Sequence, residues 1–144
     1  MREILFRAKH YKTKQWVYGI PFRNPVNGLD NDAYHPQIIP EINKMHSTID
    51  SCSVIEETIS QYTGLIDKNG TKIFEGDIVR YNDTIHKVIF CTINGSAFFG
   101  ITMPDRGEIW NFDGITCANK MEVIGNIHDN PELLGGADDE CKKV

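Results

Sequence analysis

Five histidines and four cysteines are the side chains with which this chain could bind a metal ion. The histidines lie at positions 10, 35, 46, 86 and 128 and never recur at the i, i+4 spacing that places two ligands on one helix face. No two cysteines form the Cys-x-x-Cys pair of a zinc knuckle. A composite site of His35, His46 and an aspartate from residues 30–32 is a weaker alternative, because lone surface histidines and turn aspartates are common. We therefore expect neither a metal nor a cofactor.

Motifs for nucleophilic catalysis are also absent from the sequence. There is no Gly-x-Ser-x-Gly elbow, His-Glu-x-x-His pair or phosphate-binding Gly-x-x-x-x-Gly-Lys-[Ser/Thr] loop. Cys91 and His86 are five residues apart on one predicted strand, so their side chains point to opposite faces. We expect that the protein is not an enzyme. A nucleotide- or small-molecule-processing enzyme is a third, weaker interpretation, which would require a deep pocket with converging polar groups.

Carboxylates flank a glycine in Glu75-Gly76-Asp77, a pattern that could supply an acid–base pair. A structural interpretation is stronger, because Gly76 can adopt a backbone angle that other residues avoid, and the short side chain of Asp77 can accept hydrogen bonds from nearby amides. We expect a turn here rather than a catalytic site.

Aromatic side chains are better candidates for a function, and that function would be binding. Trp110, Phe98 and Tyr81 lie in or beside predicted strands, where one face can be open to a partner. Arg80 and Arg106 could contact phosphate beside an exposed ring. Most of the rings should nevertheless be core, because aromatic side chains bury large areas.

The stretch from Gln61 to Arg80 contains the densest set of turn and strand signals, and we expect the rest of the chain to be built around it. Its glycines, Gly64, Gly70 and Gly76, fall where the backbone is expected to turn. Asn69-Gly70 is flanked by apolar residues and predicts a type I′ hairpin turn with positive φ at both positions.

Other short strands are expected at residues 4–8, 15–22, 48–55, 77–81, 84–92, 96–103, 108–112 and 121–127. Asn82-Asp83 and Asn94-Gly95 separate successive strands of an antiparallel meander. Residues 23–37 predict a long surface loop, residues 38–45 a short helix, and residues 130–134 one helical turn capped by Asn130.

These elements predict a mainly β protein with a small antiparallel, SH3-like barrel in its C-terminal half. We assign residues 1–55 to an N-terminal β unit with a long irregular loop, residues 56–129 to the barrel, and residues 130–144 to a short turn and flexible tail, all within one folding unit.

Three segments resemble the YopX family of phage and prophage proteins. The first is Arg2-Glu3-Ile4-Leu5-Phe6-Arg7-Ala8, the second is the stretch from Gln61 to Val79, and the third is Asn-Pro-Glu-Leu-Leu at residues 130–134. The family carries no established activity, so the resemblance implies a phage or prophage accessory protein and no particular chemistry.

Charge and hydropathy restrict the partners. A net charge of −5 and a pI near 5.5 argue against a broad basic surface for non-specific phosphate binding. No stretch approaches the roughly 20 apolar residues of a membrane span, and charged residues interrupt the apolar run at the N-terminus, unlike a signal peptide. We therefore expect a protein of the bacterial host cytoplasm with four reduced thiols.

Two functions from different classes follow. The leading hypothesis is a non-catalytic module that binds another protein or itself. The alternative is a nucleic-acid-binding barrel that stacks bases on Trp110 or Phe98.

Overall fold

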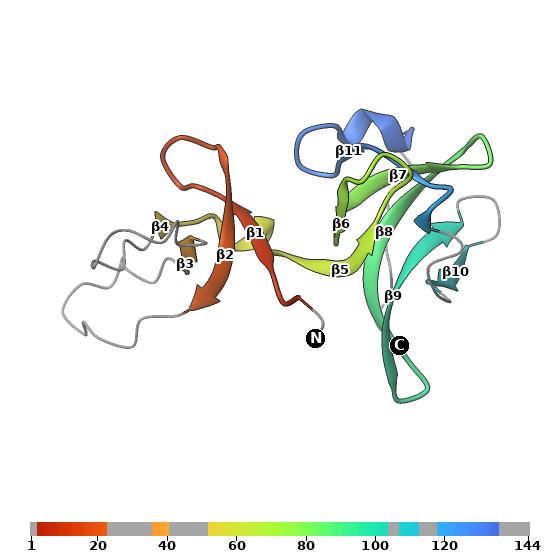
Figure 1. Ribbon diagram of the computed structural model, residues 1–144, viewed down its shortest axis with the longest axis horizontal. Coiled ribbons are helices and arrows are strands. Elements are labelled where there is room, and N and C mark those ends of the chain that lie inside the picture. Colours follow the sequence, from red (N-terminus) through yellow and green to blue (C-terminus); the bar gives the residue numbers. More distant parts are fainter. Residues whose placement is uncertain (1–2, 23–35, 41–51, 104–106, 113–117, 136–144) are drawn as a thin grey trace. The chain divides into compact units, whose positions relative to one another are not determined.

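The computed structural model describes residues 3–22, 36–40, 52–103, 107–112 and 118–135 (Figure 1). Within it the chain forms two compact units, which we call unit 1 (Met1–Gly64) and unit 2 (Leu65–Val144). The boundary between them lies at residues 64 and 65, whereas the sequence placed it at residues 55 and 56. Gly64, inside a strand and with a φ of 88°, is the last residue of unit 1.

Unit 1 is built around the predicted N-terminal hairpin. Its two strands pair antiparallel with Phe6 opposite Gly19 and Lys9 opposite Trp16. The sheet to which they belong has the order β4-β3-β2-β1-β5-β6, with strands β1 (Phe6–Lys9), β2 (Trp16–Phe22), β3 (Gln37–Pro40), β4 (Cys52–Ser53), β5 (Ser60–Ile66) and β6 (Lys72–Phe74). β5 joins the far side of β1 through the pair Phe6 and Gln61, so strands distant in sequence become neighbours.

One face of this sheet forms a small core. Ala8, Ile38 and Val54 are fully buried there, and Val17 and Ile59 pack against them. Gly19 allows β3 to approach β2 closely, because a Cβ at that position would lie 1.8 Å from the carbonyl oxygen of Ile39.

Two sequence predictions in this unit are corrected. The segment 38–45 was expected to be helical, but Gln37–Pro40 is a strand paired with β2, and residues 41–51 lie outside the described part. The β-branched pair Ile38-Ile39 fits a half-buried strand better than a helix. The same strand shortens the predicted loop, whose residues 23–35 also lie outside the described part.

Unit 2 is an antiparallel sheet with the order β10-β9-β8-β7-β11 (Figure 1). Four consecutive strands form the predicted meander, and the last strand pairs with the first of them. Their bounds are β7 (Asp77–Tyr81), β8 (Thr84–Ile93), β9 (Ser96–Met103), β10 (Glu108–Asn111) and β11 (Glu122–Asn126).

The core of unit 2 lies on one face of this sheet. Six residues are buried there, namely Ile73, Val79, Val88, Ile101, Ala118 and Met121. Leu65, Tyr81, Phe112 and Val123 pack against them. Side chains of the β5–β6 hairpin and of the segment before β11 thus cover the meander.

The prediction of a mainly β, antiparallel fold is confirmed, but the predicted closure into a barrel is wrong. Within the described residues, β10 and β11 are the two ends of the five-stranded sheet, which stays open. The SH3-like detail is not confirmed.

Turn chemistry also differs from the prediction. The two-residue turns Asn82-Asp83 and Asn94-Gly95 have positive φ at both positions (47° and 62°, 50° and 80°), as a type I′ turn requires. In the β5–β6 turn only Gly70 has a positive φ, of 83°, so type I′ is wrong there. The N–H of Asp67 donates to the oxygen of Thr71 and that of Gly70 to the oxygen of Asp67, which fits a three-residue loop with glycine at the left-handed position.

The C-terminal segment forms a 3-10 helix, η2 (Pro131–Leu134), with proline in its first turn as predicted. Asn130 makes no side-chain cap, contrary to expectation. Instead, Asn126 Oδ1 accepts hydrogen bonds from the N–H groups of His128 and Asp129, which orders the turn before the helix.

Candidate functional site

The β8–β9 hairpin and its neighbour β10 carry an aromatic surface in unit 2. Phe90 lies directly opposite Phe99, with ring centroids 5.0 Å apart and planes tilted by 58°. Trp110 on β10 lies opposite Ile101, the next residue of the same face of β9. Phe90 is 47% exposed and Trp110 is 44% exposed. Phe99 itself is buried, with 9% of its surface exposed. We call Phe90, Phe99 and Trp110 the aromatic surface.

Few charges surround this surface. In the described residues of β8, β9, β10 and the Asn94-Gly95 turn, Lys87 and Glu108 are the only lysine, arginine, aspartate or glutamate residues. Lys87 lies opposite Ile78 and therefore belongs to the other face of the sheet. An exposed apolar surface with so little charge is typical of protein–protein contacts rather than of phosphate binding.

The structure does not bring the sequence-predicted binding residues together. Phe98 lies opposite Cys91, so its side chain points to the face opposite that of Phe99 and Trp110. Tyr81 packs against the core of unit 2. Arg80 pairs with Glu122 at the far side of the sheet, and Arg106 lies outside the described residues.

Phe90 is the residue that sequence reasoning missed. The segment from Thr84 to Cys91 is apolar on both faces, so its pattern alone did not reveal which face is covered. In the structure Val88 is fully buried, whereas Phe90, two residues later on the same face, is 47% exposed.

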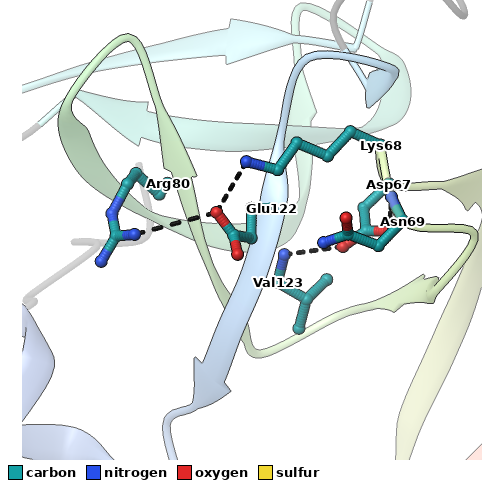
Figure 2. A network of polar contacts seen from close by, with 6 residues as sticks. All are labelled: Asp67, Lys68, Asn69, Arg80, Glu122 and Val123. Atoms are coloured by element: carbon teal, nitrogen blue, oxygen red, sulfur yellow. Dashed lines mark hydrogen bonds and ion pairs between the residues drawn. The ribbon is translucent and has the colours of Figure 1, made fainter.

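Asp67 is the centre of a polar network that fixes the β5–β6 turn (Figure 2). Its Oδ1 accepts hydrogen bonds from the N–H groups of Asn69 and Thr71, each at 2.8 Å, and its Oδ2 accepts one from the N–H of Val123 at 3.0 Å. The N–H of Lys68 donates to the oxygen of Met121 at 3.0 Å. The turn is thereby attached to β11, which lies more than 50 residues further along the chain.

Burial of Asp67 would by itself raise the pKa of its carboxyl group. The hydrogen bonds from Val123, Thr71 and Asn69 oppose this effect, and the pKa is lowered from its ordinary value of 3.8. Asp67 is therefore an ionised side chain that stabilises the fold by accepting backbone hydrogen bonds.

Glu122 occupies the neighbouring position on β11. Its Oε2 lies 2.8 Å from Lys68 Nζ and 3.8 Å from Arg80 Nη1 (Figure 2). The hydrogen bond and charge of Lys68 lower the pKa of Glu122, and Arg80 adds to this effect. This partly exposed cluster pairs opposite charges, which is typical of a structural ion pair.

Glu75-Gly76-Asp77 forms the turn between β6 and β7. Gly76 has a φ of 78°, and the fully buried Asp77 accepts a hydrogen bond from the N–H of Phe74 at 2.8 Å. The backbone of Gly76 also bonds to Val88 and Ile127. These contacts agree with the structural interpretation of this pair of carboxylates.

His86 is buried in unit 2 and is held on both sides of its ring. Nδ1 lies 2.8 Å from the carbonyl oxygen of Thr102, which can only accept, so Nδ1 carries a proton. Nε2 lies beside the hydroxyl of Thr84. Cys91, a half-buried thiol, is five residues further along the strand and points to the opposite face.

Across residues 3–22, 36–40, 52–103, 107–112 and 118–135, no three His, Cys, Asp or Glu side chains gather as metal ligands. Within the same part of the chain, no helix has the length and apolar character needed to span a bilayer.

Comparison with known proteins places the chain in a family. The family model described as YopX protein matches residues 5–135. The chain belongs to the YopX family. This YopX chain is also similar to a solved structure, the crystal structure of protein EF1440 from Enterococcus faecalis, with 26% identity and a TM-score of 0.50. The likeness covers 93% of this chain and 99% of that one. Among curated proteins, no match was found.

Among the motif residues by which the sequence resembles YopX proteins, Gly70 and Gly76 lie in turns, whereas Gly64 lies inside β5 and not in a turn as the sequence predicted. Gly64, Gly70 and Gly76 adopt positive φ, and Asn69 donates its N–H to Asp67. The motif of this YopX chain therefore specifies the fold, and the aromatic surface lies outside it.

Proposed function

We propose that this YopX-family chain is a non-catalytic interaction module that binds proteins through the aromatic surface. The observation that carries the proposal is the nearly half-exposed pair Phe90 and Trp110, on strands that hold almost no charge. Exposed aromatic groups of this kind are enriched in the centres of protein interfaces. In this view the protein acts as a phage or prophage accessory protein in the bacterial cytoplasm.

A second copy of the chain is the partner that we propose for this surface. β10 ends the five-stranded sheet of the described residues, and Trp110 lies on it. An end strand can pair with the same strand of another copy, and a two-fold axis would then bring the two aromatic surfaces next to each other.

The alternative function, base stacking on Trp110 and Phe98, has less support at this site. The two rings belong to opposite faces of the sheet, and Arg80 is engaged with Glu122. A stacking platform needs adjacent rings and a row of cations beside them.

Light scattering across a concentration series tests the proposal. The wild type should rise from the 16.4 kDa monomer towards twice that mass, whereas Phe90→Ser should remain monomeric. Tyr11→Ser is the matched control, because Tyr11 is exposed to a similar extent (46%) but belongs to unit 1. A wild type that remains monomeric at every concentration, or equal association of wild type and Phe90→Ser, would contradict self-association through this surface.

A further inference from the structure

Charge is distributed unevenly along this acidic chain. Five of its 15 basic residues and none of its 20 acidic residues lie between Ile4 and Leu29, so this stretch carries +5 and the remainder −10. Four of the five, Arg7, Lys9, Lys12 and Lys14, belong to the described β1–β2 hairpin of unit 1 (Figure 1). The net charge of −5 therefore conceals a local basic surface.

Cations and aromatic rings alternate on one face of this hairpin. Lys9 lies opposite Trp16, and Arg7 lies opposite Tyr18. The guanidinium carbon of Arg7 is 4.5 Å from the centre of the Trp16 ring system, and Lys9 Nζ is 5.5 Å from it. These cation–π contacts hold the basic groups beside the rings. Tyr18 is 43% exposed.

The turn between the two strands extends this surface. Lys14 Nζ lies 5.2 Å from the centre of the Tyr11 ring. His10 Nδ1 accepts hydrogen bonds from the N–H groups of Lys12 and Thr13, each at 3.2 Å, and the N–H of Lys14 donates to the oxygen of His10. These bonds give the turn a defined conformation in which Tyr11, Lys12 and Lys14 are exposed.

The basic face of the hairpin points away from the core of unit 1. Ala8 and Val17, which alternate with the residues named above, form that core. The acidic residues of the described part of unit 1 are Glu3, Glu56 and Glu57. The last two belong to η1 (Glu56–Thr58) and are exposed there. Arg7 itself is buried (7% exposed) and Lys9 is half-buried, so the accessible cations of this surface are Lys9 and, in the turn, Lys12 and Lys14.

We propose that this face of the β1–β2 hairpin, with its turn, binds single-stranded nucleic acid. Lysine side chains can neutralise phosphates, and exposed tyrosine rings can stack on bases whatever the sequence. An acidic polypeptide would satisfy the cations but would leave the rings without stacking partners. The proposal concerns a different unit and a different ligand from the proposed protein contact, so either can fail without the other.

Single-tryptophan variants locate the ligand, because the chain has only two tryptophans, Trp16 and Trp110. In the full-length Trp110→Phe variant, oligodeoxythymidine of about 15 nucleotides should quench the fluorescence of Trp16. In the Trp16→Phe variant, the same oligonucleotide should leave Trp110 unchanged. Quenching of Trp110 instead of Trp16, or of neither, would overturn the proposal.

Salt and charge variants test the mechanism. If Lys9, Lys12 and Lys14 each contact one phosphate, affinity should fall about tenfold between about 50 and 150 mM salt. In the double variant Lys12→Gln/Lys14→Asn one contact remains, so the same change in salt should weaken binding only about twofold. The matched control Arg80→Gln/Lys120→Gln removes two charges from unit 2 and should keep the tenfold dependence. If the salt dependence of binding fell equally in the two double variants, the effect would be one of net charge alone. That result would overturn the assignment of the binding site to the β1–β2 hairpin.

Stacking is tested separately from charge. Tyr18→Leu keeps the charge and apolar character of the position but removes the ring, so it should weaken oligonucleotide binding by about fivefold or more. Poly-glutamate should not quench Trp16 appreciably. Unchanged affinity of Tyr18→Leu, or equal quenching by poly-glutamate, would identify an acidic polypeptide site and reject nucleic acid.

Discussion

The described core of unit 1 has three buried apolar side chains with two more packed against them, whereas that of unit 2 has six with four more packed against them. The pairing also differs. Unit 2 joins β7 to β8 and β8 to β9 through two-residue turns and has one distant pairing, of β11 with β7, whereas unit 1 brings Phe6 next to Gln61. The meander of unit 2 therefore relies on local turns and a larger core, whereas unit 1 relies more on close contact between strands that are distant in sequence.

The largest expected effect is that of Gly19→Ala, which should strongly destabilise unit 1. The added Cβ would lie 1.8 Å from the carbonyl oxygen of Ile39. Relieving this overlap would require the backbone of β3 to shift, which costs free energy. We expect a loss of at least about 3 kcal/mol in the free energy of unfolding, at the upper end for overpacked sites. Urea unfolding followed by Trp16 fluorescence, in the Trp110→Phe background, measures it.

The control for this variant uses the other tryptophan. In the Trp16→Phe background, Trp110 reports on unit 2, whose transition should shift less than that of Trp16. Equal shifts of the two transitions would contradict a destabilisation that is specific to unit 1.

Asp67→Asn should produce the largest loss in unit 2. An amide can accept hydrogen bonds through only one of its two terminal atoms, so the bonds from Asn69 and Thr71 or the bond from Val123 would be lost. We expect a loss of about 2 kcal/mol, because hydrogen bonds to buried charged groups are among the stronger ones. Glu122→Gln is the matched control; Glu122 pairs at the partly exposed surface, so the effect should be much smaller.

The pH dependence of this variant provides a further prediction. Because folding lowers the pKa of Asp67, its ionised form stabilises the wild type above the ordinary value of 3.8, and this contribution is lost as the pH falls below it. The difference in unfolding free energy between wild type and Asp67→Asn should therefore be full near neutral pH and smaller at about pH 3. A difference that grew on acidification would contradict the lowered pKa.

The same contrast explains how much the sequence predicts. The meander of unit 2 was predictable because Asn82-Asp83 and Asn94-Gly95 specify their turns within two residues. The pairing of β3 with β2 was not, because nothing local to Ile38 and Ile39 identifies Ile20 and Pro21 as their partners. Residue type alone predicted a binding set of Trp110, Phe98, Tyr81, Arg80 and Arg106. Residue type does not determine which face of a strand a ring occupies.

The closure of the sheet could not be predicted for a related reason. The sequence indicates the number of strands, but closing a sheet into a barrel also requires a matching stagger and tilt of those strands. The bulge in β11 between Val123 and Gly125 and the attachment of Val123 to Asp67 direct the last strand towards the β5–β6 turn. The hydrogen bond from Val123 to Asp67 thus attaches β11 to the β5–β6 turn, a tertiary contact that the number of strands does not reveal.

Gly70→Val should have an intermediate effect on unit 2. Open space surrounds a Cβ at this position, so no steric contact opposes it, but the φ of 83° is unfavourable for a β-branched residue. We expect a loss of more than about 1 kcal/mol, measured as a shift of the thermal unfolding midpoint. Gly70→Ala should cost less than valine, and an unchanged midpoint for Gly70→Val would contradict the left-handed assignment.

The smallest expected effects on the free energy of unfolding are those of alanine substitutions in the two Asn-Gly turns. Asn94 has a φ of 50°, whereas Asn69 is absent from the positive-φ residues of the described chain. Asparagine tolerates the left-handed region better than alanine does, so Asn94→Ala should cost about 1 kcal/mol. Asn69→Ala should cost less than about 0.5 kcal/mol, because the bond to Asp67 uses its backbone N–H, which alanine retains. Urea midpoints of the two variants, measured side by side, decide between the turn types, since equal losses would restore a type I′ turn at Asn69-Gly70.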